Sequence, residues 1–476
     1  MGERPHVVLL MADHLRWDCL SSYGDLAVRT PHLDALAEES VVFERAYCAT
    51  PLCTPTRCSM YTGKHPHVHG AIVNGHIYEE EQPYGCINPE HRTLYEVLDD
   101  AGYGVMHVGV QHCRCEPDIT ERVPEAYFGG NEYFEHAAER GIKRNPQTRE
   151  FFVPSIEWRG GRPVVDRRGQ HRKTRFPHGA EDFLDGWWSR LAAEKVAGLD
   201  FSRPQYVEAL FWAPHPPMEV PEPYHSMYPP EGIELPETVG RWYDGQPASL
   251  LFQTCGHLGH GRLREEFRET WSAYFGLVTM VDECIGRVVA ALRERGIWDD
   301  ALVVFTQDHG DMLGCHHLLQ KNCFYEAAAH VPLLIKPPGG AAGRRAQLAS
   351  AIDYCPTVCD YAGLESPDGV AGRSLRPVAE QRATEWRDAV FMEYNGDQGR
   401  NIWPTRGIVA EADGRLWKYI WTSGDVDELY NVTEDPMEKE SLVDCEGHGA
   451  LRRRLRERLA RWMSETGDPV RIEDAG

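Results

Sequence analysis

The chain has 476 residues, of which 42% are hydrophobic and 26% are charged, and its formal net charge is −23. This size suits one large domain and a smaller one, and so acidic a chain is not expected to take nucleic acid as a general partner. No segment approaches the roughly 20 consecutive apolar residues of a membrane helix, so we expect no membrane span.

The first residues lead almost directly into an apolar run that begins at Val7. Because no hydrophobic leader precedes this run, we expect a cytoplasmic protein without a signal peptide. The 14 cysteines are spread thinly along the chain, whereas a secreted disulfide scaffold is shorter and denser in cysteine. We therefore expect most of the cysteines to be reduced and buried.

Apolar runs alternate with helical patterns, which predicts an α/β fold with helices on the faces of a sheet. Thr30 before Pro31 is typical of a helix start, and Gly102 and Gly296 are typical of helix ends. Past about Gly372 the pattern changes, so we predict a large domain over residues 1–372 and a small α+β domain over 373–476. The predicted strands are Val7–Met11, Val207–Trp212, Leu302–Phe305 and Val331–Ile335, and the predicted helices are Pro31–Val42, Thr93–Ala101, Glu265–Arg295 and Ala450–Ser464.

The most informative motif is the run Cys53-Thr54-Pro55-Thr56-Arg57, followed by Ser59, Thr62 and Gly63. Pro55 suits the first turn of a helix, which we expect to begin at about Thr56 and to aim its positive end at a bound anion. The motif alone leaves two interpretations open. Cys53 is either a nucleophile or a buried structural cysteine beside a proline turn.

Two aspartates follow directly on predicted strands, Asp13 after Val7–Met11 and Asp308 after Leu302–Phe305. In open α/β sheets, ligands bind beyond the carboxyl ends of the strands. Either aspartate alone is more often a helix cap. Together with Cys53 they predict a site for one divalent cation, because carboxylate oxygens suit calcium, magnesium or manganese.

Residues from about Gly129 to Arg175 differ from the rest, because long apolar runs are few and cations are many. We interpret this stretch as an insertion over the face that carries the predicted site. Its charges belong either to a solvated loop, which is the expected case, or to a lid that contacts an anionic substrate. The cations are Arg140, Lys143, Arg144, Arg149, Arg159, Arg162, Arg167, Arg168, Arg172, Lys173 and Arg175.

Ordered motifs over nearly the whole chain resemble the formylglycine-dependent sulfatases. This resemblance implies an alkaline-phosphatase-like fold, in which helices sandwich a large mixed sheet and a small C-terminal domain carries an antiparallel sheet. The matching segments are Asp13–Gly24 with Thr30–Asp34, Cys53–Arg57 with Ser59, Thr62–Pro66, Gly70–Asn74, Gly102-Tyr103 with His112, Pro214–Pro217 with Pro221 and Tyr224, Phe305–Gly314 with Lys321 and Phe324–Glu326, and Glu428–Asn431 with Asp435-Pro436.

The resemblance also implies a role for each matching residue. A formylglycine-generating enzyme oxidises Cys53 to an aldehyde, whose hydrate attacks the ester and then expels the sulfate through its second hydroxyl. One cation, with calcium expected ahead of manganese and magnesium, is held by Asp13, Asp308, His309 and the modified Cys53. Arg57 supports the aldehyde hydrate, His112 helps to remove its second proton, His215 and Lys321 hold the ester oxygens and protonate the leaving alcohol, and Asn74 is a weaker candidate for contacting substrate oxygens.

The chain departs from the sulfatase pattern at two positions. His14 stands where a second aspartate is usual, and Val110 stands where a lysine is usual, in the run Gly109-Val110-Gln111-His112. An imidazole at position 14 still binds a metal but carries less negative charge, whereas valine supplies no charge at all. Phosphonate monoester hydrolases also vary at these places, so the departures keep phosphorus esters open as substrates.

Three functions therefore stand side by side. The expected one is hydrolysis of a small-molecule or saccharide sulfate ester. The second is hydrolysis of a phosphonate monoester or phosphodiester with the same nucleophile, because both esters carry the single negative charge of a sulfate monoester. The third is a silent relative that binds anions without turnover. A homo-oligomer is possible, but no sequence feature marks an interface.

Overall fold

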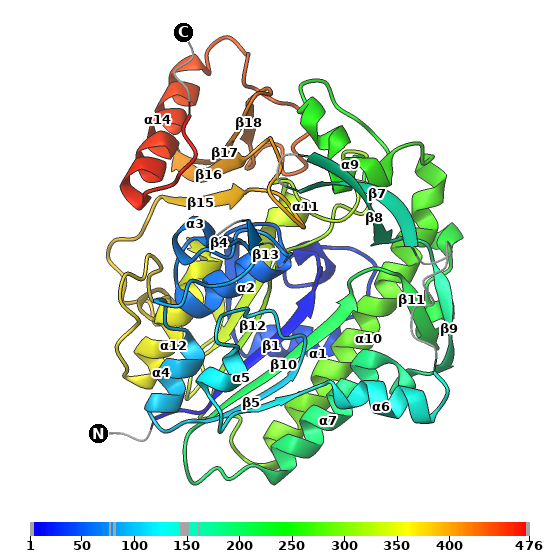
Figure 1. The fold of residues 1–476 in the computed structure, drawn as a ribbon, viewed down its shortest axis with the longest axis vertical. Coiled ribbons are helices and arrows are strands. Elements are labelled where there is room, and N and C mark those ends of the chain that lie inside the picture. Colours follow the sequence, from blue (N-terminus) through cyan, green and yellow to red (C-terminus); the bar gives the residue numbers. More distant parts are fainter. Residues whose placement is uncertain (1–3, 76–77, 80–81, 143–151, 160–161, 473–476) are drawn as a thin grey trace.

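An eight-stranded mixed sheet forms the centre of the larger domain, in the order β14-β2-β13-β12-β1-β10-β5-β6 (Figure 1). The computed structural model describes residues 4–472 except 76–77, 80–81, 143–151 and 160–161. Strand β13 is antiparallel to both of its neighbours, and the other adjacent pairs are parallel. The strands are β1 (Val7–Asp13), β2 (Val41–Tyr47), β5 (Gly104–Gly109), β6 (Tyr127–Gly129), β10 (Gln205–Pro214), β12 (Leu302–Gln307), β13 (His330–Lys336) and β14 (Gly343–Ser350).

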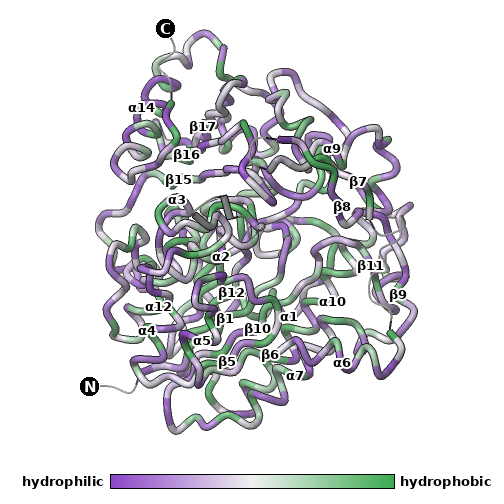
Figure 2. Tube along the Cα trace, viewed as in Figure 1, coloured by the Kyte–Doolittle hydropathy of each residue, from purple (hydrophilic) through white to green (hydrophobic). Residues whose placement is uncertain are grey.

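The central strands are hydrophobic along their length (Figure 2), and every residue of β1 and β12 is buried. This is the pattern of strands that helices cover on both faces. Helices α1 (Pro31–Glu38), α7 (Leu184–Gly198) and α10 (Phe267–Glu294) pack together on one side, and α2 (Cys53–Thr62), α4 (Leu94–Asp100) and α12 (Tyr354–Ala362) pack together on the other (Figure 1). The predicted fold class is confirmed.

Shorter elements connect these layers. They are the helices α3 (Pro66–His69), α5 (Ile119–Arg122), α8 (Tyr224–Met227), α9 (Thr254–Gly259), α11 (Glu326–Ala329) and α13 (Arg376–Ala379), and the strands β3 (Tyr78–Glu79), β4 (Gln82–Pro83) and β11 (Glu219–Glu222).

All four predicted strands are present, but the predicted helix Pro31–Val42 was too long. Helix α1 ends at Glu38, and Val41 begins strand β2. The apolar residues Val41, Val42 and Phe43 extend a helical pattern in the sequence. In the fold they pair with β13 on one side and β14 on the other, so tertiary pairing decides their conformation.

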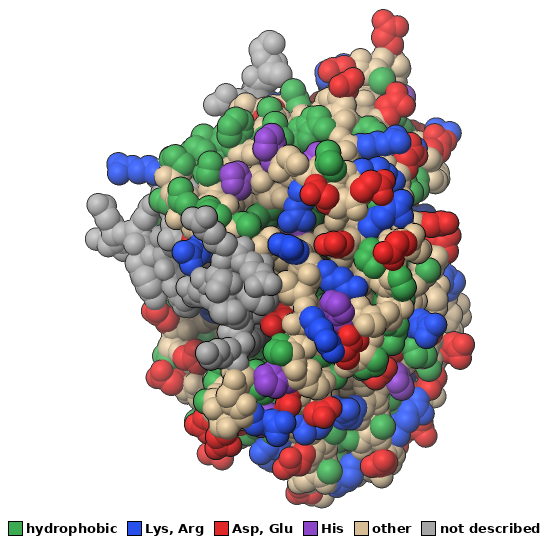
Figure 3. All heavy atoms as spheres, turned by 90° about the vertical axis from the view of Figure 1, so that its right-hand side faces the viewer, with side chains coloured by type: hydrophobic (Ala, Val, Ile, Leu, Met, Phe, Trp, Pro, Cys, Tyr) green, Lys and Arg blue, Asp and Glu red, His purple; other side chains and the backbone are tan. Residues whose placement is uncertain are grey.

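The insertion contains regular structure, so its interpretation as a loop was wrong. It holds α6 (Glu132–Glu139), a hairpin of β7 (Phe152–Arg159) and β8 (Arg162–Gly169), and β9 (Thr174–Gly179), which pairs with β11. The predicted cations Lys143, Arg144 and Arg149 lie outside the described residues. On the face that carries the insertion, basic and acidic side chains are interspersed (Figure 3), so the described cations form no continuous basic surface there.

A second, four-stranded antiparallel sheet forms the small C-terminal domain at the top of Figure 1. Its strands are β15 (Ala389–Tyr394), β16 (Thr405–Ala412), β17 (Arg415–Thr422) and β18 (Glu428–Asn431), and helix α14 (Gly449–Thr466) covers one face. Leu455, Leu459, Trp462 and Met463 recur at helical spacing on α14 and are buried against this sheet. The division at residue 372 stays a prediction.

None of the 14 cysteines, all of which lie in the described residues, forms a disulfide, and all but Cys445 are buried, as expected. Within the described part of the chain, no helix combines the length and the apolar character needed to cross a bilayer.

A buried ion pair joins the two domains. The backbone N–H of His67, on α3, donates to Glu393 of β15 at 2.6 Å, and the His67 imidazole contacts the same carboxylate. Burial disfavours both charged forms, but the pairing outweighs it. The Glu393 carboxylate raises the pKa of His67 above 6.5, and His67 lowers the pKa of Glu393 to about 2.

The His67–Glu393 pair predicts a stability that depends on pH. The stabilisation that follows from the raised pKa of His67 is fully present below pH 6.5 and is lost as the pH rises through the folded pKa. The stabilisation that follows from the lowered pKa of Glu393 is present above about pH 4.3 and is lost as the pH falls through its folded pKa. We expect His67→Gln to lower the free energy of unfolding by about 2 kcal/mol at pH 6 and by clearly less at pH 9. Urea unfolding at both pH values measures this.

The matched control is His225→Gln, because His225 pairs with Glu222 at the surface, at 3.7 Å. It is expected to change the free energy of unfolding by less than about 0.5 kcal/mol. An equal loss for His67→Gln at both pH values would show that packing, and not the charge, holds this contact.

Candidate active site

The carboxyl ends of five strands that run in the same direction lie at one edge of the sheet. Asp13 ends β1, Asp308 follows β12, Val110 follows β5, and His215 follows β10. Cys53 begins α2 shortly after β2. The topology therefore collects these residues from distant parts of the chain at the place where α/β sheets bind ligands.

Cys53 is the first residue of α2 and is buried. The helix was predicted to begin at Thr56 and instead begins three residues earlier, which places Pro55 inside its first turn. The N–H of Thr54, which has no acceptor within the helix, donates to Asn74 Oδ1 at 3.0 Å. Burial and the nearby Asp13 carboxylate raise the pKa of the Cys53 thiol, although the helix start and the neighbouring cations favour a negative charge.

Arg57 lies one turn after Cys53 on α2 and is completely buried. Its guanidinium donates to Asp13 Oδ2 at 3.1 Å and to Asp308 Oδ2 at 3.0 Å, so one cation joins the ends of β1 and β12. Burial and Asp308 raise the pKa of Asp13 to about 7. Burial also opposes the charge of Asp308, but His309 and Arg57 outweigh it and hold the pKa of Asp308 below its usual range.

Four buried side chains point potential metal donors at one another. Donor atoms of Asp13, His14, Cys53 and His309 all lie within 4.8 Å of one another. Nε2 of His309 is 3.2 Å from Cys53 Sγ and 3.8 Å from Asp13 Oδ1. Metal–ligand distances of about 2.0–2.2 Å place the donors of one ion about 3–4 Å apart, so this group fits a divalent cation.

Asp308 lies beside this group and does not belong to the set of four. Its Oδ2 is 3.8 Å from His309 Nε2 and is bonded to Arg57, and its Oδ1 accepts from the backbone N–H of His309 at 3.0 Å. An incoming ion would thus compete with Arg57 for the Asp308 oxygens. The predicted ligands therefore lie together, with Asp308 beside the other four and not among them.

Three further basic side chains, those of Lys321, His215 and His112, lie near these residues. Lys321 is buried, and its Nζ is 3.0 Å from Cys53 Sγ. The ring of His215 packs between Trp212 and His14, at centroid distances of 4.1 and 4.2 Å. Burial and the nearby positive charges, Lys321 for His215 and Arg57 for His112, lower the pKa of both histidines. In the described structure, the buried Nδ1 of His112 has no hydrogen-bond partner.

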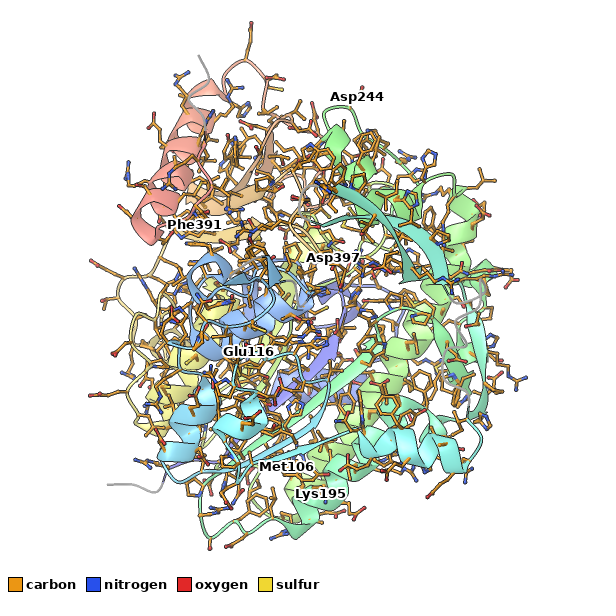
Figure 4. The ribbon with its side chains drawn as sticks, viewed as in Figure 1. Met106, Glu116, Lys195, Asp244, Phe391 and Asp397 are labelled. Atoms are coloured by element: carbon orange, nitrogen blue, oxygen red, sulfur yellow. The ribbon has the colours of Figure 1, made fainter. Side chains whose placement is uncertain are left out.

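Asn74 does not offer its amide to the site in this structure. Its Oδ1 accepts from Thr54, and its Nδ2 donates to Asp397 Oδ1 at 3.0 Å. Asp397 lies where a loop of the C-terminal domain meets the larger domain (Figure 4), and Arg168 of β8 donates to its Oδ2 at 2.8 Å. These bonds support the start of α2, which the sequence reasoning did not foresee because the partners are far apart in the chain.

Asp311 and His171 were also missed. Asp311 Oδ2 accepts from His14 Nδ1 and from His171 Nε2, both at 2.9 Å. The sequence could have pointed to Asp311, because it follows Asp308 by only three residues. Nothing in the sequence points to His171, because it lies in a basic segment of the insertion without a recognisable motif.

The chain is similar to known proteins over most of its length. The family described as Sulfatase matches residues 5–364, and the family described as N-sulphoglucosamine sulphohydrolase, C-terminal, matches residues 314–465. An arylsulfatase of Clostridium perfringens is 28% identical over 93% of this chain and 91% of its own length. A multifunctional alkaline phosphatase superfamily protein, PehA of Trinickia caryophylli, is 26% identical over 98% and 96%.

Among solved structures, the phosphonate monoester hydrolase of Agrobacterium radiobacter superimposes with a TM-score of 0.78 and 26% identity, over 97% of this chain and 96% of that one. The fold and the strand-end site define a hydrolase of the alkaline phosphatase type. The chain belongs to the sulfatase family, which places it among the sulfuric ester hydrolases.

The position of Arg57 between two buried carboxylates predicts a large effect of its removal. We expect Arg57→Met to lower the free energy of unfolding of the metal-free protein by about 3–5 kcal/mol, because Asp13 and Asp308 lose their shared partner. Urea unfolding in the presence of a chelator measures this. In the control Arg458→Met, the lost partner Asp388 is 62% exposed, and the expected loss is below about 1 kcal/mol. Similar losses in the two variants would contradict the role given to Arg57.

Proposed function

We propose that this chain hydrolyses sulfate esters with a formylglycine made from Cys53, assisted by one divalent cation. The observation that carries the proposal is the position of Cys53 Sγ. It lies at the start of α2, 3.0 Å from Lys321 Nζ, 3.2 Å from His309 Nε2 and 3.6 Å from Asp13 Oδ1. This sulfur stands in for an oxygen of the hydrated aldehyde. Cations and metal donors surround that position, as stabilisation of a transferred anion requires.

The side chains around residue 53 take distinct parts in this proposal. Asp13, His14, Asp308 and His309 hold the cation, which supplies Lewis-acid stabilisation of the transferred group. Arg57 fixes both carboxylates. Lys321 and His215 hold the ester oxygens and donate the proton that the leaving alcohol needs, and the unpartnered Nδ1 of His112 is available to accept a proton from the hydrate.

The donor set favours a particular cation. Sequence reasoning placed calcium first, but calcium prefers six to eight oxygen ligands. Here two of the four clustered donors are the imidazole nitrogens of His14 and His309. Of the three candidate ions, manganese alone is a transition metal and accepts imidazole ligands more readily than the other two, so we propose manganese ahead of calcium and magnesium.

A phosphonate monoester or phosphodiester is the second candidate substrate. Val110 contributes only its carbonyl oxygen, which accepts from Arg57 at 2.9 Å, where the sulfatase pattern carries a lysine. The similarity to a phosphonate monoester hydrolase supports this alternative. Sulfate monoesters, phosphonate monoesters and phosphodiesters each carry a single negative charge. An aryl or saccharide sulfate remains the first choice because named sulfatases are among the relatives. Maturation by a formylglycine-generating enzyme and a cytoplasmic location stay predictions.

The nucleophile is tested with protein made alongside a formylglycine-generating enzyme. The mass of the tryptic peptide Ala46–Arg57 should show Cys53 as the aldehyde and Cys48 unchanged. We expect Cys53→Ala to lower kcat/KM for nitrophenyl sulfate by at least about 10³-fold with its circular dichroism unchanged, because the nucleophile is lost. The control Cys359→Ala removes a buried thiol of α12 and should keep full activity.

Nitrophenyl phenylphosphonate and bis-nitrophenyl phosphate complete the substrate panel. A higher kcat/KM on either phosphorus ester would replace the sulfatase proposal with the second candidate. No turnover of any ester by metal-loaded protein with a confirmed aldehyde would favour the silent relative. Retained activity in Cys53→Ala would sink the mechanism.

Metal removal gives an independent prediction. Because a bound cation contributes several kcal/mol to such a reaction, dialysis against a chelator should lower kcat/KM by at least about 100-fold. Equal concentrations of Mn²⁺, Mg²⁺ and Ca²⁺ are then added back, and Mn²⁺ is expected to restore the most activity. Full activity without metal would contradict the site, and better recovery with Ca²⁺ would contradict the argument from the imidazole donors.

A further inference from the structure

His14 is held in one orientation by partners on both sides of its ring. Nδ1 is 2.9 Å from Asp311 Oδ2, and Nε2 accepts from the ammonium group of Lys321. A carboxylate accepts and an ammonium group donates, so the proton lies on Nδ1 and the lone pair lies on Nε2. Nε2 lies within 4.8 Å of donor atoms of Asp13, Cys53 and His309, and a cation bound there would take the place of the Lys321 ammonium group on its lone pair. An imidazole whose second nitrogen donates to a carboxylate is the arrangement that orients histidine ligands of metals.

The backbone at His14 is also constrained. Its φ is +66°, in the left-handed region that residues other than glycine seldom adopt. The carbonyl of His14 accepts from Tyr274 at 2.6 Å, and the N–H of Arg16 donates to the same hydroxyl at 2.7 Å. Such a conformation persists only where surrounding contacts determine it. The chain therefore fixes both the backbone and the ring of His14.

Asp311 is buried, and both of its oxygens are used. Oδ1 accepts from the backbone N–H groups of Leu313 and Gln320, each at 2.9 Å. Oδ2 accepts from His14 and from His171. Because backbone groups of the same loop hold Oδ1, the direction of Oδ2 is fixed. The second donor to Oδ2, His171, restrains it further.

His171 reaches Asp311 from the insertion. It is completely buried, and its carbonyl accepts from Thr270 of α10 at 2.6 Å. Two residues earlier, Gly169 approaches the loop of His215 so closely that an added Cβ would lie 3.0 Å from the backbone nitrogen of Pro217. The end of β8 and the residues after it are thus packed against the rim of the site, and His171 enters from a well-fixed backbone.

We propose that His171 and Asp311 are positioning residues, and that through them the insertion sets the orientation of His14 as a metal ligand. This inference rests on the proposed metal site. The chain has an imidazole where its family has a carboxylate, and an imidazole ligates only along the lone pair of one nitrogen. The negative charge that a carboxylate ligand would have brought comes instead from Asp311, which bonds the far side of the His14 ring. His171 fixes the direction of the Asp311 carboxylate.

The test measures metal binding, and it does not depend on turnover. Isothermal titration of the chelator-treated full chain with Mn²⁺ gives a Kd, and the absorption spectrum of the Co²⁺ form reports the ligand geometry. We expect His171→Leu to raise the Kd for Mn²⁺ by about 10–100-fold and to change the Co²⁺ spectrum. His171→Gln, which keeps an N–H donor at similar reach, should stay within about threefold of the wild type. Asp311→Asn, whose single amide oxygen cannot replace both carboxylate oxygens, should resemble His171→Leu.

Two further variants separate positioning from general destabilisation. His136 of the same insertion pairs with Asp182 at 3.3 Å, so His136→Leu removes a comparable pair away from the metal donors and should leave the Kd unchanged. In a His14→Ala background there is no imidazole to orient, so His171→Leu should add little to the loss. Additive losses would indicate a merely structural role and overturn the inference.

The outcomes also separate this inference from the proposed function. A wild-type protein that binds Mn²⁺ while His171→Leu keeps the same Kd and the same Co²⁺ spectrum would overturn the positioning role alone. A wild-type protein that binds no Mn²⁺ would overturn the metal site and this inference with it. If His171→Leu does not fold, the test rests on Asp311→Asn. A Kd of Asp311→Asn for Mn²⁺ equal to that of the wild type would overturn the proposal.

Discussion

The buried guanidinium of Arg57 is the interaction on which the site depends. The sheet brings Asp13 and Asp308 together at the ends of adjacent strands, where burial and mutual repulsion oppose two negative charges. Arg57 bonds both carboxylates, and it lies one turn after Cys53 on the same helix. The contact that stabilises the two carboxylates therefore also fixes Cys53 beside them.

Contacts from the C-terminal domain and from the insertion also hold the start of α2. Glu393 donates its N–H to the carbonyl of Ala49, just before α2, and Asp397 holds Asn74, which caps the N–H of Thr54. Arg168 of the insertion bonds the same Asp397. Three separate parts of the chain thus meet around the first turn of one helix, and neither the sheet nor the motif alone positions Cys53.

Much of the fold was predictable because its signals are local. Strands buried on both faces read as apolar runs, and the flanking Asp13 and Asp308 then fall at one edge by topology. Cys53, Arg57, His215 and Lys321 came from their motifs. What could not be predicted depends on contacts between distant segments. Strand β8 carries three arginines and only exposed or half-buried residues, so no long apolar run marks it. The end of α1 is decided by the pairing of β2, and His171 and Asp397 act through partners more than a hundred residues away.

The two departures from the family pattern offset each other in charge. Replacing a carboxylate by His14 removes one negative charge, and replacing a lysine by Val110 removes one positive charge. Arg57 and Lys321 still balance Asp13 and Asp308, so in the proposed mechanism the charge of a bound cation would remain to attract the substrate. A site with this balance suits a group that carries one negative charge, which sulfate, phosphodiester and phosphonate monoesters share. If these esters are the substrates, selection among them would come from groups beyond the transferred one. The Arg168–Asp397 pair is one charged contact between the insertion and the C-terminal domain, and through Asn74 it lies beside the start of α2.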